Sequence, residues 1–162
     1  MDAQNSPQNP PRGYTSLTPY LVVDGGSRAI DFYTTVFGAA LVARIDAPDG
    51  TVAHAELQFE SGRMQLSDPQ PGINLLAPDG TETVNHSYVL YCADVDTVWQ
   101  AAVTAGAKPF EEPSTFVTGD RFGSLLDPFG HRWAIMTRVE DVSDEEAERR
   151  VNEWMAGQEQ PA

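Results

Sequence analysis

Residues 119–138 read GDRFGSLLDPFGHRWAIMTR, and this pattern predicts a β-hairpin. Two apolar-rich runs, Phe122–Leu126 and Arg132–Thr137, flank the turn sequence DPFG at positions 127–130. In such a turn the proline fixes φ, the aspartate can accept hydrogen bonds from the turn backbone, and the glycine can adopt a positive φ. Because an isolated hairpin is only marginally stable in water, we expect these two strands to belong to a larger sheet.

The same strand–helix–three-strand order occurs twice along the chain. Gly38 and Gly106 each end a predicted helix, and Gly62 and Gly130 each turn the last hairpin; the two members of each pair are 68 residues apart. Two landmarks at one offset indicate an internal repeat. In the first copy we expect a helix at 27–37, with Ser27 as its N-cap, and strands at 17–23, 40–45, 52–60 and 63–67. In the second copy we expect a helix at 94–105 and strands at 87–93, 108–117, 121–126 and 132–138.

The repeat divides the chain into three parts. Residues 1–13 are proline-rich and mostly polar, which is typical of a disordered lead-in. Residues 14–138 form a single domain with modules at about 14–68 and 84–138. Residues 139–162 carry a capping-box pattern that starts a helix, with Trp154 on its apolar edge. We expect that edge to dock on this chain or on a second subunit.

Composition excludes several classes of partner. The chain has 24 acidic and 10 basic residues and a net charge of −14, so it repels nucleic acid and anionic membranes. No apolar stretch approaches the length of a membrane span, and no signal peptide is visible. Cys92 is the single cysteine, which excludes an intrachain disulfide and favours a buried structural thiol over a reactive one. We therefore expect a cytoplasmic protein.

Two motifs carry a resemblance to a known family. The helix motif AIDFYTTVFG at 29–38 and the turn DPFGH at 127–131, within a duplicated βαβββ pattern, resemble the vicinal oxygen chelate superfamily. That group contains glyoxalase I, extradiol dioxygenases and bleomycin-resistance proteins. The likeness covers about residues 17–138, and GDRFG at 119–123 is most similar to its uncharacterised glyoxalase-like branch. The resemblance implies an α+β fold in which two βαβββ modules form a curled mixed sheet with a concave cleft, followed by a C-terminal helix.

The resemblance also implies where a divalent metal would bind. Enzymes of the superfamily hold it with His or Glu side chains from the first and last strands of each module. In this sequence the corresponding positions are Thr18, Gln65, Ser87 and Ala134, and none of them is a good metal ligand. We therefore expect no metal at this site and no cofactor.

The same strands supply the candidate ligand-binding residues. By alternation, Tyr20 shares a face with Thr18, Tyr91 with Ser87, and Arg132 with Ala134. Arg132 could clamp a carboxylate or phosphate of a ligand, or form a salt bridge to one of the many acids. The expected ligand-binding set is Thr18, Tyr20, Gln65, Ser87, Tyr91, Arg132 and Ala134.

A second constellation contains the histidines. His54 and Glu56 lie two apart on one strand and so share a face. On the concave face they would form a proton-transfer pair or half of a relocated metal site, which His86 could join; on the other face they would form a solvated polar edge. His131, at the turn exit, suggests a structural hydrogen bond more than catalysis.

Three functions fit this sequence. The first is a metal-independent protein that binds a small organic molecule in the cleft, as the bleomycin-resistance proteins do. The second is a divalent-metal-dependent lyase, isomerase or dioxygenase with a site relocated to His54, Glu56 and His86. The third is a structural or regulatory interaction protein. In all three we expect a homodimer.

Overall fold

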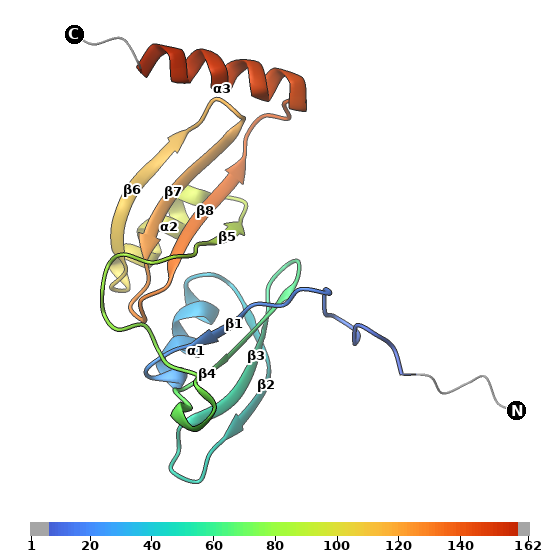
Figure 1. Cartoon of the computed structure of the whole chain (residues 1–162), viewed down its shortest axis with the longest axis vertical. Helices are drawn as coiled ribbons and strands as arrows, with labels where there is room; N and C mark the ends of the chain where they lie inside the picture. Colours follow the sequence, from blue (N-terminus) through green and yellow to red (C-terminus); the bar gives the residue numbers. More distant parts are fainter. Residues whose placement is uncertain (1–6, 159–162) are drawn as a thin grey trace, which may run out of the picture. The chain divides into compact units, whose positions relative to one another are not determined.

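The computed structural model describes residues 7–158, which form two compact units divided between Gly80 and Thr81. The first unit contains a four-stranded sheet in the order β1-β4-β3-β2, in which β1 pairs parallel with β4 and the other pairs are antiparallel. Figure 1 shows its helix beside this sheet. Its elements are β1 (Tyr20–Val22), α1 (Gly26–Thr35), β2 (Ala40–Asp46), β3 (Val52–Gln58), β4 (Arg63–Ser67) and the short 3-10 helix η1 (Pro71–Ile73).

The second unit repeats this topology. Its sheet has the order β5-β8-β7-β6, again with one parallel pair, β5 with β8. The predicted pair of βαβββ modules and the C-terminal helix are therefore confirmed, and each module forms a sheet of its own. The elements are β5 (Tyr88–Tyr91), α2 (Val95–Thr104), β6 (Lys108–Thr115), β7 (Asp120–Leu126), β8 (Arg132–Arg138) and α3 (Asp144–Gln158).

The predicted hairpin forms as expected from its turn. Asp127 Oδ1 accepts hydrogen bonds from the backbone N–H groups of Phe129 and His131, each at 2.9 Å, and Gly130 has a φ of 88°. The carboxylate does more than the sequence indicates, because its Oδ2 accepts a third bond of 2.8 Å from the indole Nε1 of Trp133. One buried side chain thus fixes both the turn and the first core residue of β8.

The start of α1 differs from the prediction. Ser27 lies inside the helix, where its hydroxyl accepts a hydrogen bond from Arg44, and the N-cap is Gly25 at a φ of 100°. Asp68, at the end of β4, takes the capping role: its Oδ1 accepts from the N–H groups of Gly25 and Gly26 at 2.9 Å, and its Oδ2 accepts from Val52 at 2.7 Å. A carboxylate also suits the positive end of the helix dipole.

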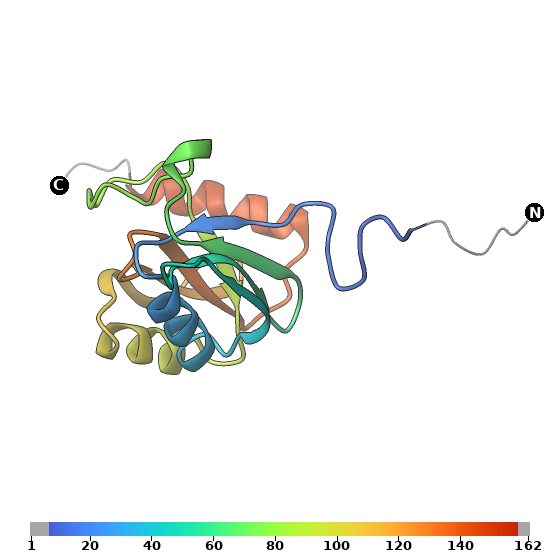
Figure 2. The same ribbon diagram turned by 90° about the horizontal axis from the view of Figure 1, so that it is seen from below.

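Each sheet is covered on one face by its own helix, as Figures 1 and 2 show for α1. In the first unit alternate strand residues pack under α1, and in the second the α2 residue Trp99 packs against Gly123 of β7. The strand residues that alternate with these buried ones point to the other side of each sheet. We call these two sides the face opposite α1 and the face opposite α2. The buried residues under the helices include Leu21, Ala55, Leu57, Met64 and Leu66 in the first unit and Leu125, Trp133 and Ile135 in the second.

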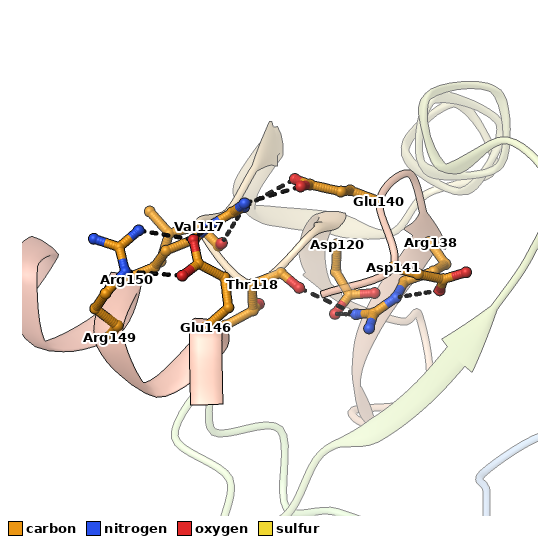
Figure 3. A network of polar contacts seen from close by, with 9 residues as sticks. All are labelled: Val117, Thr118, Asp120, Arg138, Glu140, Asp141, Glu146, Arg149 and Arg150. Carbon is orange, nitrogen blue, oxygen red and sulfur yellow. Dashed lines mark hydrogen bonds and ion pairs between the residues drawn. The ribbon is translucent and has the colours of Figure 1, made fainter. Parts of the chain in front are cut away.

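The C-terminal helix α3 docks on its own chain, at the β6–β7 turn (Figure 1). The Trp154 ring meets Phe116 edge-on, with ring centroids 5.3 Å apart. Figure 3 shows the polar part of this contact: Arg150 donates to both carboxylate oxygens of Glu140 at 2.9 Å and to the carbonyl of Val117 at 3.3 Å. The predicted docking of the Trp154 edge is thus made within the chain.

No helix in the described residues has the length and apolar character needed to cross a membrane.

Two adjacent arginines of α3 allow a matched test of this docking. Arg150 bonds to Glu140 outside the helix, whereas Arg149 pairs with Glu146 and Glu153 of the helix itself. We expect Arg150→Ala to speed hydrogen–deuterium exchange across 144–158 and Arg149→Ala to change it little, because only the first loses contacts to the rest of the unit. Equal acceleration by both variants would show that the docking does not depend on Arg150.

Candidate functional site

The face opposite α1 gathers polar side chains from three strands. β3 presents His54 and Glu56 there, because the neighbouring Ala55 and Leu57 are buried under the helix. β4 presents Arg63 and Gln65 by the same alternation. The register places Gln65 beside Glu56 on one side and Tyr20 of β1 on the other. His54 and Glu56 therefore lie on the sheet face that α1 does not cover.

These side chains are linked by ion contacts. Glu56 Oε1 lies 3.4 Å from His54 Nε2, and Glu56 Oε2 lies 3.2 Å from Arg63 Nη1. Arg63 Nε also donates to Gln58 Oε1 at 3.0 Å. The side chains of His54, Glu56, Gln58 and Arg63 are all half-buried, so salt screens these ion pairs less than it screens pairs at the exposed surface. Glu56 is therefore held in place on both of its oxygens.

Tyr14, which precedes β1, completes the cluster. Its hydroxyl accepts a hydrogen bond of 3.2 Å from Gln65 Nε2, and the Arg63 guanidinium lies 4.8 Å from its ring centroid. The Tyr14 hydroxyl, followed by His54 and Arg63, holds the pKa of Glu56 below its usual value of 4.5, against the opposing effect of burial. Glu56 is thus an ionised acceptor at neutral pH.

The remaining candidates of the first unit lie at different places. The ring of Tyr20 is 6.1 Å from that of His54 and tilted against it, and the residue is 37% exposed. Thr18 lies before β1, which begins at Tyr20, and its hydroxyl donates to the carbonyl of Thr15 at 3.2 Å. Tyr20 therefore offers an aromatic surface beside the polar cluster, while Thr18 belongs to the turn that leads into the sheet.

The face opposite α2 holds the second set of candidates. Arg132 Nη1 donates to Ser87 Oγ at 2.8 Å, and its Nη2 lies 3.2 Å from Glu111 Oε2. Ser124 also donates to Glu111. Ala134 lies on the same face, between Val89 and Ser124. Arg132 thus forms a salt bridge with Glu111, and its role as a ligand clamp stays a prediction.

Of the other two candidates in the second unit, Tyr91 lies on the predicted face of a strand, whereas Ser87 lies outside the strand. Tyr91 of β5 pairs with Met136 and is exposed, on the same face as Ala134. Ser87 precedes β5, so its contribution comes from the strand entry. The two units carry equivalent arginines: Arg63 and Arg132 each open the last strand and each pairs with an acid. Gln65 and Ala134, two residues further on, each lie on the sheet face that the helix of their unit does not cover.

The three residues of the predicted relocated metal site do not share a unit. His54 and Glu56 belong to the first unit, whereas His86 belongs to the second. There His86 Nε2 lies 3.5 Å from Nδ1 of His131. Among residues 7–158 no three His, Cys, Asp or Glu side chains gather as a metal-binding group.

Sequence reasoning missed Tyr14, Arg63 and Glu111 as site residues. Arg63 had a usable signal, because it follows the hairpin glycine Gly62 as Arg132 follows the hairpin turn of the second repeat. Tyr14 had none, since it lies in an irregular segment with no periodicity. Glu111 lies on the edge strand β6, where register shifts on both sides of it, toward Pro109 and toward Ser114, interrupt simple alternation.

Comparison with known proteins agrees with this architecture. The profile of the Glyoxalase/Bleomycin resistance protein/Dioxygenase superfamily matches residues 15–135. The uncharacterized protein Mb0911c of Mycobacterium bovis is 36% identical over 143 residues, which cover 85% of this chain and 92% of the relative. The uncharacterized protein Rv0887c of Mycobacterium tuberculosis is also 36% identical, with 85% and 82% covered.

Solved structures show the same fold. The crystal structure of TioX from Micromonospora sp. ML1 matches with a TM-score of 0.60 and 25% identity, over 75% of this chain and 97% of that one. A glyoxalase/bleomycin resistance protein/dioxygenase from Nocardioides matches with a TM-score of 0.57 and 21% identity, over 80% and 87% of the two chains. The chain belongs to the Glyoxalase/Bleomycin resistance protein/Dioxygenase superfamily.

Proposed function

We propose that this chain is a metal-independent small-molecule-binding protein of the glyoxalase/bleomycin-resistance type, and that the face opposite α1 is its binding surface. The observation that carries the proposal is the polar cluster of Tyr14, His54, Glu56, Arg63 and Gln65 on that face. The position that the family resemblance assigns to a metal ligand is filled there by Gln65, whose amide is a poor ligand for the transition metals that the family uses.

The charges on this face indicate the class of ligand. Arg63 is already paired with Glu56 and Gln58, and Glu56 is paired with His54 and Arg63. The cluster is therefore close to neutral, and a strongly charged ligand would have to displace an existing pair. The surface that is free to make contact is the half-exposed ring of Tyr20 beside His54. We propose an uncharged or zwitterionic planar molecule that stacks on Tyr20 and hydrogen-bonds to His54 or Gln65.

Two aromatic residues of nearly equal exposure allow a matched test. Tyr20 is 37% exposed on the proposed surface, and Phe110 is 38% exposed on the edge strand β6 of the other unit. We expect Tyr20→Ala to weaken the binding of planar fragments by about twofold to twelvefold, since an aromatic stacking pair contributes about 0.5–1.5 kcal/mol. Isothermal titration in the presence of EDTA would measure this, and Phe110→Ala should bind as the wild type does. Equal binding by the Tyr20→Ala variant would contradict the proposal.

A second candidate is an enzyme that moves protons through His54. The 3.4 Å contact to the ionised Glu56 orients the imidazole of His54, and a general base needs such a fixed orientation toward the proton that it accepts. In that case His54→Gln would abolish turnover of a bound molecule while leaving its affinity within a few fold.

The predicted homodimer and the cytoplasmic location stay predictions.

A further inference from the structure

The strongest unassigned cluster is a pair of histidines at the entrance to β5. His86 Nε2 lies 3.5 Å from His131 Nδ1, and the two rings are 5.7 Å apart between centroids. His131 is 5% exposed and is anchored by the turn, because its backbone N–H donates to the buried Asp127. His86 is exposed at the surface. The pair thus joins one fixed imidazole to one that can be reached from solvent.

The side-chain amide of Asn85 determines which ring nitrogen of a neutral His86 carries the proton. His86 Nδ1 lies 2.9 Å from the side-chain oxygen of Asn85, which can only accept a hydrogen bond. This contact places the proton of a neutral His86 on Nδ1 and leaves the lone pair on Nε2, the nitrogen that lies 3.5 Å from His131 Nδ1. Metal-bound histidines commonly donate their second ring N–H to an oxygen in this way, which fixes the tautomer and raises the basicity of the ligand nitrogen.

The spacing of the two nitrogens suits a tetrahedral ion. At 3.5 Å it is long for a hydrogen bond from N–H, which lies at about 2.7–3.2 Å. Two nitrogens bound to one tetrahedral zinc at about 2.05 Å are about 3.4 Å apart. At the same bond length, neighbouring positions of a square-planar or octahedral ion are about 2.9 Å apart, which fits less well. Hard cations such as Mg²⁺ and Ca²⁺ prefer oxygen ligands.

We propose that His86 and His131 form a two-histidine Zn²⁺ site that leaves two coordination positions for water or a small anion. On binding, His131 carries its proton on Nε2 so that Nδ1 can coordinate. The Tyr88 ring lies 5.1 Å from His86 and 6.0 Å from His131 and shelters one side of the pair. The net charge of −14 favours the approach of a cation. The site lies within the second unit and is independent of the binding surface proposed on the first.

The three histidines of the chain provide the test and its control. Untagged full-length protein, freed of metal with EDTA and then desalted, is titrated with Zn²⁺ in competition with a chromophoric chelator. We expect one Zn²⁺ per chain, and an affinity at least tenfold weaker in His86→Ala. His54→Ala removes the remaining histidine, in the first unit, and should bind Zn²⁺ as the wild type does. Cys92→Ser should also leave binding unchanged, because burial raises the pKa of that thiol and disfavours its ligating form.

Two further readouts complete the design. Because His86 is exposed, its alanine variant should fold, and unchanged tryptophan fluorescence would confirm this. In spectra of the histidine rings, Zn²⁺ should shift the signals of His86 and His131 and leave those of His54 in place. Absence of Zn²⁺ binding, or equal binding by wild type and His86→Ala, would overturn the proposal.

Discussion

Asp127→Ala is expected to destabilise the second unit by about 4 kcal/mol, because a buried donor left without its acceptor costs about 1–3 kcal/mol. Asp127 is 3% exposed and accepts from three donors: two backbone N–H groups of the turn and the indole of Trp133. Alanine leaves all three unpaired in a place that water reaches poorly. Asp127→Asn keeps one oxygen for the backbone but turns an NH₂ group toward the indole. We therefore expect its loss of stability to lie between those of the wild type and Asp127→Ala.

The tryptophans make this effect measurable in one unit. Trp99, Trp133 and Trp154 all lie in the second unit, so the fluorescence change during urea unfolding reports on that unit. The fully exposed Asp141, which pairs with Arg138 at the surface, provides a control, and Asp141→Ala should shift the midpoint little. A midpoint for Asp127→Ala close to that of Asp141→Ala would show that the turn does not depend on this carboxylate.

Asp68→Ala is expected to destabilise the first unit by about 3–4 kcal/mol, for the same reason. Asp68 is 9% exposed and accepts from Gly25, Gly26 and Val52, so it joins the start of α1 to the start of β3. Without it, the positive end of the helix loses its anion and β3 loses a fixed end. Since β3 carries His54 and Glu56, the candidate binding surface should become less ordered as well.

Hydrogen–deuterium exchange at the three amides would test this directly. Exchange at Gly25, Gly26 and Val52 should become at least a hundredfold faster in Asp68→Ala. Asp49→Ala is the matched control: it also removes a carboxylate that accepts a backbone N–H, from Thr51, but in an exposed turn. Similar exchange rates in the two variants would contradict the role given to Asp68.

Much of the fold was accessible from the sequence, because its signals are local. The turn at 127–130 carries its own proline, aspartate and glycine, and the repeat places a matching turn at Gly62. The start of α1 was not accessible, because its cap comes from a residue 43 positions away from Gly25. Ser27 is a good N-cap residue by type, yet the distant carboxylate satisfies the helix N-terminus first.

The candidate site was accessible only in part. Alternation correctly placed His54 and Glu56 on one face, but which face the helix covers depends on how the module folds. A bulge in β2–β3 between His54 and Val52 also reverses the alternation locally, so that Val52 is buried although it is two residues from His54. The contact of Tyr14 with Gln65 spans 51 residues and follows from no pattern in the chain.

The most direct test of metal-independent binding on the face opposite α1 is a ¹H–¹⁵N spectrum of the full chain. The protein is kept in EDTA while uncharged and zwitterionic planar fragments are added one at a time. Shifts that saturate at Tyr20, His54, Glu56 and Gln65, and that stay unchanged when Zn²⁺ replaces EDTA, are the result we predict. Fragments that bind only after metal is added, or that shift only residues outside this face, would contradict the account.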